Sequence, residues 1–482
     1  MGINRIILAA ILSVAGLVSC KGAQDDADIV VRPDKSVAKV SPLFWGTNFL
    51  FWIEDDAALA DGSIEKSLKE LPCTMLRYPG GTVADNFHWR TNTLDNTAMF
   101  PYEEGGTESD FDEFMAFCGR VGAEPLLVVN TQSWYLKRDI EGGAREASEW
   151  VRYCKEKGYK VKYWEIGNET YWHTVMTARE YGALANVYAK AMKAEDPDII
   201  ISVNGGWDIE MTGNKERTDS SLWEGIRQEY LGLRTEADYK AFKDRTDALV
   251  TKPWTTGENK WWHDLITECG DNIDMVSVHW YYHDNVLKHI DKKINELKAY
   301  LKEMKPGKDY LVCLSEYNCN TPEPDLRMSG FAESLGRFLN AGVDMACFWP
   351  LRIGGSSKPT NNRSMLVMDS KARQYPWTVM KMLQANLKGN MVKCKSPEDV
   401  FAYASVDGKD MTVVISGRRL KERRTFTFSP GARTASISAM NYVPNVEKMD
   451  VVPDAVEIKK EGSVYAVDID PGTFTMIKIR LK

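Results

Sequence analysis

Two glutamates are placed where their carboxyl groups could act on a substrate. Glu169 closes the segment Tyr-Trp-Glu-Ile-Gly-Asn-Glu, and Glu316 directly follows the apolar run 311–315. A carboxylate at the end of a buried strand is costly to desolvate without partners, so a chemical role is the simplest reason to retain it. Two carboxyl groups about 5 to 5.5 Å apart can cleave a glycosidic bond, because one protonates the leaving oxygen while the other attacks the anomeric carbon. The sequence therefore predicts retaining glycosidase chemistry at this pair.

The elements around these glutamates follow a repeating pattern. From about residue 40 to 385, short apolar runs alternate with amphipathic helical patterns, which is typical of a parallel βα repeat. We expect strands at 44–46, 74–78, 125–130, 162–166, 199–204, 275–279, 310–315 and 345–349. We expect helices at 109–120, 144–157, 177–194 and 284–304. Such a chain suits an α/β fold of the (β/α)8 TIM barrel type, in which strands four and seven, the ones that lead to the two glutamates, face each other across the mouth.

One long insertion interrupts the repeat. It is polar and aromatic, covers residues 208–260 and includes an expected helix at 221–232. Because it follows the fifth strand, at the end of the barrel where loops build active sites, we expect it to shape the cleft or to cover it.

The last part of the chain predicts a second domain. After residue 391, short alternating segments separated by turn residues indicate a C-terminal antiparallel β-sandwich. We therefore assign 29–390 to a catalytic barrel and 391–482 to the sandwich, to which a strand at 29–31 could add. The basic run 418–424 is expected to be a solvated hairpin.

The N-terminus carries an export signal. Residues 1–20 contain the basic Arg5, an apolar run at 6–18 and the ending Leu-Val-Ser-Cys, which resembles a bacterial lipobox in which Cys20 becomes the acylated first residue. The polar stretch 21–28 is interpreted as a tether. We expect an exported lipoprotein on the periplasmic or cell-surface side of the outer membrane, anchored by a lipid on Cys20. A plain secretory signal with an incidental cysteine is the alternative.

Composition and cysteine spacing argue against several function classes. A net charge of −7 gives no basic footprint for nucleic acid, so we expect no nucleic-acid partner. The sequence has no Cys-x-x-Cys pair or similar metal-ligand spacing, and we expect neither a metal nor a cofactor. The cysteines other than Cys20 lie along apolar segments and are interpreted mostly as buried small residues, although an exported protein could hold one or two disulfides. The oligomeric state stays open.

Several motifs occur in a fixed order along the predicted barrel. They are Leu-Arg-Tyr-Pro-Gly-Gly at 76–81, Phe-Asp-Glu-Phe-Met at 111–115, Gly-Ala-Glu-Pro at 122–125, Lys-Tyr-Trp-Glu-Ile-Gly-Asn-Glu at 162–169, Val-Ser-Val-His-Trp-Tyr-Tyr at 276–282, Ser-Glu-Tyr-Asn at 315–318, and Trp349. The Asn-Glu dipeptide alone is common, but the ordered set resembles clan A of the retaining glycoside hydrolases, and within it family 51, the alpha-L-arabinofuranosidases. The resemblance covers roughly residues 29–390 and implies the same barrel.

This resemblance implies roles for individual residues. Glu169 would be the general acid/base and Glu316 the nucleophile of a double displacement that needs no metal. Asn168 would hydrogen-bond the hydroxyl beside the anomeric carbon, and Arg77 would keep Glu316 ionised, because a nearby cation lowers a carboxylate pKa. The implied donor-sugar subsite is completed by His279, Tyr281, Tyr282 and the floor residue Trp349, with Asn130 and Asn204 as further candidate polar contacts.

Two segments depart from the family 51 pattern. Arabinofuranosidases of this family usually carry Gly-Ser-Phe-x-Glu-His soon after the first strand, whereas this chain reads Gly-Thr-Asn-Phe-Leu-Phe-Trp at 46–52 and lacks that sugar-binding glutamate. The family's Pro-Gly-Gly-Asn is Pro-Gly-Gly-Thr at 79–82. Apolar residues in place of polar contacts, together with tryptophans near the predicted strand ends, would suit a wider aromatic cleft. These residues are Leu50, Phe51, Trp52, Trp134, Trp172, Trp207, Trp261 and Trp280.

Three functions follow from these observations. The leading hypothesis is an alpha-L-arabinofuranosidase-like retaining glycoside hydrolase acting on plant or algal polysaccharide. An endo-acting β-glycanase with an open aromatic cleft is the first alternative. A lipoprotein that binds glycans without cleaving them is the second, but a binder needs no acid/nucleophile pair such as Glu169 and Glu316.

Overall fold

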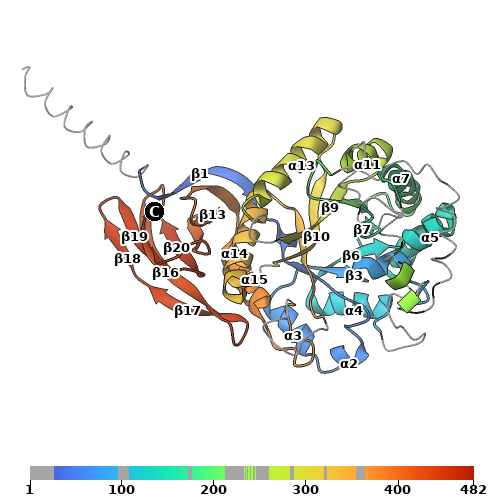
Figure 1. Cartoon of the computed structure of the whole chain (residues 1–482), viewed down its shortest axis with the longest axis horizontal. Helices are drawn as coiled ribbons and strands as arrows, with labels where there is room; N and C mark the ends of the chain where they lie inside the picture. Colours follow the sequence, from blue (N-terminus) through green and yellow to red (C-terminus); the bar gives the residue numbers. More distant parts are fainter. Residues whose placement is uncertain are drawn as a thin grey trace, which may run out of the picture.

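The computed structural model describes residues 26–95, 108–171, 176–211, 260–282, 287–319, 323–353 and 364–482, together with single residues between 229 and 245. It consists of a barrel and a β-sandwich, and Figure 1 shows helices α14 (Pro324–Asn340) and α15 (Tyr375–Asn386) between the two. This confirms the predicted fold class. The lipidation site Cys20, most of the tether and the helix expected at 221–232 lie outside the described residues.

Eight parallel strands close the barrel in the order β10-β11-β2-β3-β6-β7-β8-β9. Their bounds are β2 Gly46–Asn48, β3 Met75–Tyr78, β6 Glu124–Val129, β7 Tyr163–Ile166, β8 Ile200–Gly205, β9 Met275–Tyr282, β10 Leu311–Cys319 and β11 Met345–Phe348. The first strand begins at Gly46 rather than at residue 44, because Pro42–Phe44 forms a short 3-10 helix. There Pro42 pre-sets the backbone angle and the Ser41 side chain accepts from the backbone N–H of Leu43.

Helices cover the outside of the barrel, as the alternating pattern predicts. The main ones are α3 (Ser63–Glu70), α4 (Phe111–Val121), α6 (Ile140–Lys157), α7 (Ala178–Glu195), α11 (Trp261–Cys269) and α13 (Ile290–Met304), and short ones are α2 (Asp56–Leu59) and α5 (Gln132–Leu136). Asp110 begins α4 and Thr177 begins α7, each with a full capping box that satisfies free backbone N–H groups of the first turn. None of the described helices combines the length and apolarity needed to cross a bilayer.

A short linking segment follows β3 at the mouth of the barrel. The 3-10 helix η2 (Gly81–Asn86) leads into a hairpin of β4 (Phe87–His88) and β5 (Thr93–Leu94). This segment brings polar side chains next to the ends of β6 and β7.

The second domain is one mostly antiparallel sheet of ten strands in the order β17-β16-β20-β14-β13-β12-β1-β15-β19-β18. Its bounds are β1 Ile29–Lys39, β12 Asn390–Lys395, β13 Phe401–Asp407, β14 Asp410–Ser416, β15 Arg424–Ser429, β16 Thr434–Asn445, β17 Asp450–Val456, β18 Ile458–Glu461, β19 Val464–Ile469 and β20 Phe474–Leu481. Strand β1 pairs antiparallel with β12 and parallel with β15. The range 29–390 that the sequence assigned to the barrel therefore begins with a strand of the other domain.

The basic run 418–424 is not simply a solvated hairpin. Arg418 is only 6% exposed, and it lies with Arg419 against the buried Glu333 of α14. The prediction was wrong at these two residues because the partner carboxylate lies on a distant helix.

The cysteines of the described chain are all free, and seven of the eight are buried. They pack as small apolar residues, as expected, since burial raises the pKa of thiols such as Cys73 to about 12 and keeps them neutral.

Candidate active site

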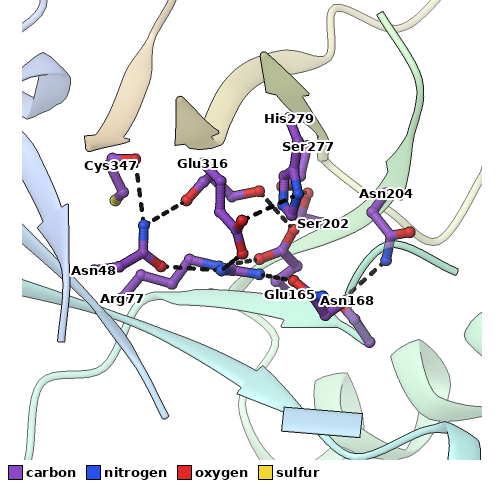
Figure 2. A network of polar contacts seen from close by, with 12 residues as sticks. Asn48, Arg77, Glu165, Asn168, Ser202, Asn204, Ser277, His279, Glu316 and Cys347 are labelled. Carbon is purple, nitrogen blue, oxygen red and sulfur yellow. Dashed lines mark hydrogen bonds and ion pairs between the residues drawn. The ribbon is translucent and has the colours of Figure 1, made fainter. Parts of the chain in front are cut away.

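The candidate site lies at the carboxyl ends of the barrel strands. Arg77 belongs to β3, His279 to β9 and Glu316 to β10, and Glu169 follows β7 after a short loop. Parallel strands end on the same side of a barrel, so these distant segments deliver their side chains to one place. Figure 2 shows Arg77, His279 and Glu316 converging from their separate strands.

Arg77 is fully buried at the centre of this network. Its Nε donates to Oε2 of Glu165 at 2.7 Å, and its Nη1 donates to Oε1 of Glu316 at 2.8 Å. Nη1 also donates to Oδ1 of Asn48 at 3.0 Å, and Nη2 donates to Oδ1 of Asn168 at 2.7 Å. One guanidinium is thereby shared by two buried carboxylates, with charge-assisted hydrogen bonds that fix both of them.

Glu316 is held at both carboxylate oxygens. Oε1 accepts from Arg77, and Oε2 accepts from the hydroxyl of Tyr281 at 2.6 Å. Nδ1 of His279 lies 3.4 Å from the same Oε2, and the Glu316 side chain is 5% exposed. A carboxylate fixed in this way presents a defined oxygen to a substrate atom, as a nucleophile must.

Glu169 is the more accessible carboxyl group. Its side chain is 23% exposed, and its Oε1 lies 2.8 Å from Nδ1 of His279. One oxygen of Glu169, one oxygen of Glu316 and a ring nitrogen of His279 all lie within 4.8 Å of one another. This spacing agrees with the roughly 5 to 5.5 Å of retaining glycosidases and is shorter than the roughly 6.5 to 9.5 Å that an inverting enzyme needs for its water.

The titration of the site is governed by burial and by shared charge. Burial raises the pKa of Glu316. The positive charges of His279 and Arg77 oppose this rise, and the negative charge of Glu169 adds to it. Burial acts to lower the pKa of His279, but the carboxylates of Glu316 and Glu169 outweigh it and the pKa is raised. The protonation of His279 and that of Glu316 therefore depend on each other.

The same three residues have the ligand types of a metal site, since Glu169, His279 and Glu316 each offer a donor atom. Both oxygens of Glu316, however, already accept hydrogen bonds from Arg77 and Tyr281. The permanent charge of Arg77 also repels a second cation at this distance. The arrangement suits proton transfer and nucleophilic attack better than metal binding.

The other residues expected to bind substrate divide into three cases. The amide Nδ2 atoms of Asn168 and Asn130 are buried without a hydrogen-bond partner among the described residues, so each retains a donor. Trp349 follows β11, and its ring lies against Gly81, where a Cβ would approach the ring to 2.6 Å. Tyr281 contacts Glu316, but the side chain of Tyr282 lies outside the described part of the chain.

Sequence reasoning missed three residues of the network. Glu165 accepts from Arg77 and from the Ser315 hydroxyl at 2.9 Å, and Asn48 binds both Arg77 and the backbone oxygen of Ser315 at 2.9 Å. Asp85 accepts from the backbone N–H of Asn168 at 3.1 Å. A charged residue inside an apolar strand was a usable signal for Glu165, whereas nothing in the local sequence marks Asp85.

The structure corrects the expected aromatic cleft. The following side chains are fully buried and cannot stack on a sugar: Leu50, Phe51, Trp261 and Trp280. Trp280 packs against Trp207 at a ring distance of 4.6 Å, and Trp261 stacks on Tyr181 at 6.1 Å, so both serve packing of the barrel. Trp172 lies outside the described residues. The half-buried members are Trp52, Trp134 and Trp207.

Comparison with known sequences supports the resemblance. The family model described as the alpha-L-arabinofuranosidase 1 domain matches residues 67–224. The chain is 30% identical over 220 residues to alpha-L-arabinofuranosidase C from Emericella nidulans, covering 38% of this chain and 42% of that protein. The match thus spans about two fifths of the length of this curated relative.

Comparison with solved structures extends the likeness in fold to nearly the whole chain. The family 51 alpha-L-arabinofuranosidase of Thermotoga petrophila is 19% identical with a TM-score of 0.66, covering 94% of this chain and 100% of the other. CelM2, a bifunctional glucanase-xylanase from a metagenome library, is 15% identical with a TM-score of 0.64, covering 95% and 99%. The chain therefore resembles alpha-L-arabinofuranosidases in sequence over part of its barrel and has the fold that these two solved structures share.

Proposed function

We propose that this protein is a retaining glycoside hydrolase that cleaves alpha-L-arabinofuranosyl linkages of plant or algal polysaccharide. One observation carries the proposal: one carboxyl oxygen of Glu169 and one of Glu316 lie within 4.8 Å of each other across the mouth of the barrel. That spacing leaves no room for the water of an inverting mechanism between the second carboxylate and the sugar.

The first half-reaction forms a covalent intermediate. A carboxylate oxygen of Glu316 forms a bond to the anomeric carbon as the bond from that carbon to the leaving oxygen breaks. The carboxyl group of Glu169 gives its proton to the leaving oxygen, so the aglycone departs as a neutral alcohol. Arg77 and Tyr281 hold Glu316 for this attack.

The second half-reaction releases the sugar. The Glu169 carboxylate takes a proton from a water molecule whose oxygen bonds to the anomeric carbon, and the ester bond to Glu316 breaks. His279 contacts the carboxyl groups of both Glu169 and Glu316. It therefore stays beside Glu169 both when that residue donates its proton and when it takes one from water. Two inversions give net retention at the anomeric centre.

The comparisons support the two glutamates to different degrees. The range 67–224 that matches the family model contains Arg77 and Glu169. The relative that is similar to this chain in sequence is named as an alpha-L-arabinofuranosidase. Glu316 lies outside that range, so its role as nucleophile rests on its geometry. The unpartnered amide donors of Asn168 and Asn130 are suited to sugar hydroxyl groups, and Trp349 offers a ring surface for the sugar face.

An endo-acting glycanase is the second candidate. It is favoured by the fold shared with CelM2, which is named as a glucanase-xylanase, and by the half-buried Trp52, Trp134 and Trp207. It is disfavoured because Phe51, Trp261 and Trp280, which were also expected to line a wide cleft, are buried in the barrel.

The same proposal places the protein at a membrane. The Leu-Val-Ser-Cys ending supports a lipid anchor on Cys20 and export to the periplasmic or cell-surface side of the outer membrane. Such a position would expose the barrel to polysaccharide or to oligosaccharides derived from it. Metabolic labelling with a fatty acid tests the anchor. If the protein with Cys20 intact stays unlabelled, the proposal of a lipid anchor is wrong.

The activity is tested with the purified full chain in detergent. It is incubated with arabinan, arabino-oligosaccharides, xylan, β-glucan and algal galactan, and Glu316→Ala serves as the control. We expect release of arabinose from the arabinosides and complete loss of turnover in the control. NMR should show that the first-formed product has the same anomeric configuration as the substrate. Oligosaccharide products would favour the endo-acting candidate. Wild-type turnover by Glu316→Ala, or binding without any product, would overturn the hydrolase.

A further inference from the structure

The loop that carries Glu169 has an unusual backbone. Between the end of β7 at Ile166 and Thr170, Gly167 has φ +68° and Glu169 has φ +44°. A left-handed conformation suits glycine but costs about 1 kcal/mol or more in a residue such as glutamate, so surrounding contacts must hold it. Besides the backbone oxygen of Val129 and the hydroxyl of Tyr181, two side chains, one on either side of the loop, supply these contacts.

Asp85 of η2 holds one side of the loop. It is 2% exposed, and its Oδ1 accepts from the hydroxyl of Thr131 at 2.6 Å and from the backbone N–H of Asn168 at 3.1 Å. The loop lies tightly against this pair: a Cβ on Gly167 would come within 2.5 Å of the Thr131 hydroxyl and 3.1 Å of the Asp85 carboxylate. Only glycine fits there.

Asn204 at the end of β8 holds the other side. Its Nδ2 donates to the backbone oxygens of Ile166 and Gly167, each at 3.1 Å, and its Oδ1 accepts from the backbone N–H of Thr170 at 2.8 Å. The side chain is fully buried. Asn204 thus mimics a backbone strand and satisfies groups that the turn leaves open.

We propose that Asp85 and Asn204 are positioning residues for the acid/base carboxyl group of Glu169. Together they bind backbone groups on both sides of it, and so keep Glu169 beside His279 and within reach of Glu316. The inference rests on the proposed glycosidase function of Glu169. It assigns to two side chains outside the catalytic pair the task of orienting the carboxyl group that donates the proton.

A clamp of this kind makes a prediction that a merely structural role does not. Misplacing Glu169 impairs protonation of the leaving oxygen, which matters for poor leaving groups and hardly at all for leaving groups that depart as stable anions. The leaving-group dependence of kcat/KM therefore reports the position of Glu169, whereas general damage to the fold lowers kcat/KM equally for all substrates.

The experiment compares Asp85→Ala, Asn204→Ala and Glu169→Ala with wild type on aryl alpha-L-arabinofuranosides of graded leaving-group acidity. The matched control is Asp344→Ala, because Asp344 also accepts a backbone N–H, that of Val312 at 2.9 Å, but at the opposite end of the barrel. For the clamp variants we expect kcat/KM to fall about 100-fold for unactivated phenols and only a few-fold for dinitrophenol-type groups. Asp344→Ala should leave the slope unchanged.

Two further arms keep the inference testable. Asp85→Asn retains an acceptor oxygen for Asn168 and should restore kcat/KM to within about tenfold of wild type, even if Asp85→Ala folds poorly. In a crystal structure of Asn204→Ala, the backbone of Glu169 should have left its positive φ angle, and its carboxyl group should have moved away from His279. Equal loss across the substrate series, or an unmoved Glu169, would overturn the clamp. If wild type itself cleaves none of the substrates, the proposed function fails, and the crystal structure still decides the clamp.

Discussion

Two buried networks of arginine and glutamate in this molecule have opposite charge ratios. At the mouth of the barrel, the single guanidinium of Arg77 serves the carboxylates of Glu165 and Glu316, and Glu169 lies close by. Between the domains, the carboxylate of Glu333 is contacted by three guanidinium groups, those of Arg337, Arg418 and Arg419, of which Arg337 also pairs with Asp291 at 3.0 Å.

The charge ratio explains why one network is reactive and the other structural. Where positive charge is in surplus, both carboxylate oxygens of Glu333 are bound by guanidinium groups, and its side chain is only 1% exposed. Where negative charge is in surplus, burial and the neighbouring charge of Glu169 raise the pKa of Glu316, and both carboxylates raise the pKa of His279. A shortage of cations thus favours proton binding at the mouth of the barrel, whereas the surplus around Glu333 does not.

The largest effect on the interdomain network should follow from Glu333→Gln. This change leaves three arginines without their shared carboxylate, and removing one partner of a buried ionic cluster typically costs about 3–5 kcal/mol. We expect the free energy of unfolding in urea to fall by that amount while kcat/KM of the folded protein stays unchanged. Glu447→Gln, at an exposed glutamate of the sheet domain, is the control. A parallel loss of activity at temperatures where the variant is folded would show that the two networks are coupled.

A one-to-one pair lies between these extremes and gives the second prediction. Arg352 donates to Oε2 of Glu54 at 2.9 Å but directs its remaining donors to backbone oxygens of Ile53 and Met368. Burial raises the pKa of Glu54 from 4.5 to about 7, with Arg352 opposing the rise. One cation with divided contacts is therefore not enough to offset the burial of one carboxylate.

The sign of the resulting pH dependence is fixed by this raised pKa. The stability that Glu54 contributes is fully present below its unfolded pKa and is lost as pH rises through the folded value of about 7. Glu54→Gln should remove this loss, so that between pH 5 and pH 8 the unfolding free energy of wild type falls relative to the variant by up to about 3 kcal/mol. Urea unfolding at both pH values measures it. A constant difference between the two proteins would mean that Arg352 holds Glu54 ionised throughout.

The outcome of the sequence predictions follows the range of the interactions. The eight strands, the main helices and the position of both glutamates at strand ends were predicted because hydrophobic period, caps and strand ends are local signals. Asp85 was missed because its partner, the backbone N–H of Asn168, lies 83 residues away and leaves no local mark. Trp261 and Trp280 were placed in a cleft because a tryptophan near a strand end has the same sequence appearance whether it faces the mouth or the helices. The prediction that Arg418 is exposed to solvent was wrong because its partner Glu333 belongs to another domain.

The smallest predicted effect tests the surplus of cations most directly. Arg419 is the most exposed of the three arginines around Glu333, with 27% of its side chain accessible, and Arg337 and Arg418 remain if it is removed. Arg419→Ala should therefore cost no more than about 1 kcal/mol of unfolding free energy, the level of a partly exposed salt bridge. If it costs as much as Glu333→Gln, the carboxylate has no surplus of partners. The interdomain network would then be balanced as finely as the one at the mouth of the barrel, and the charge ratio would not be what separates a structural network from a reactive one.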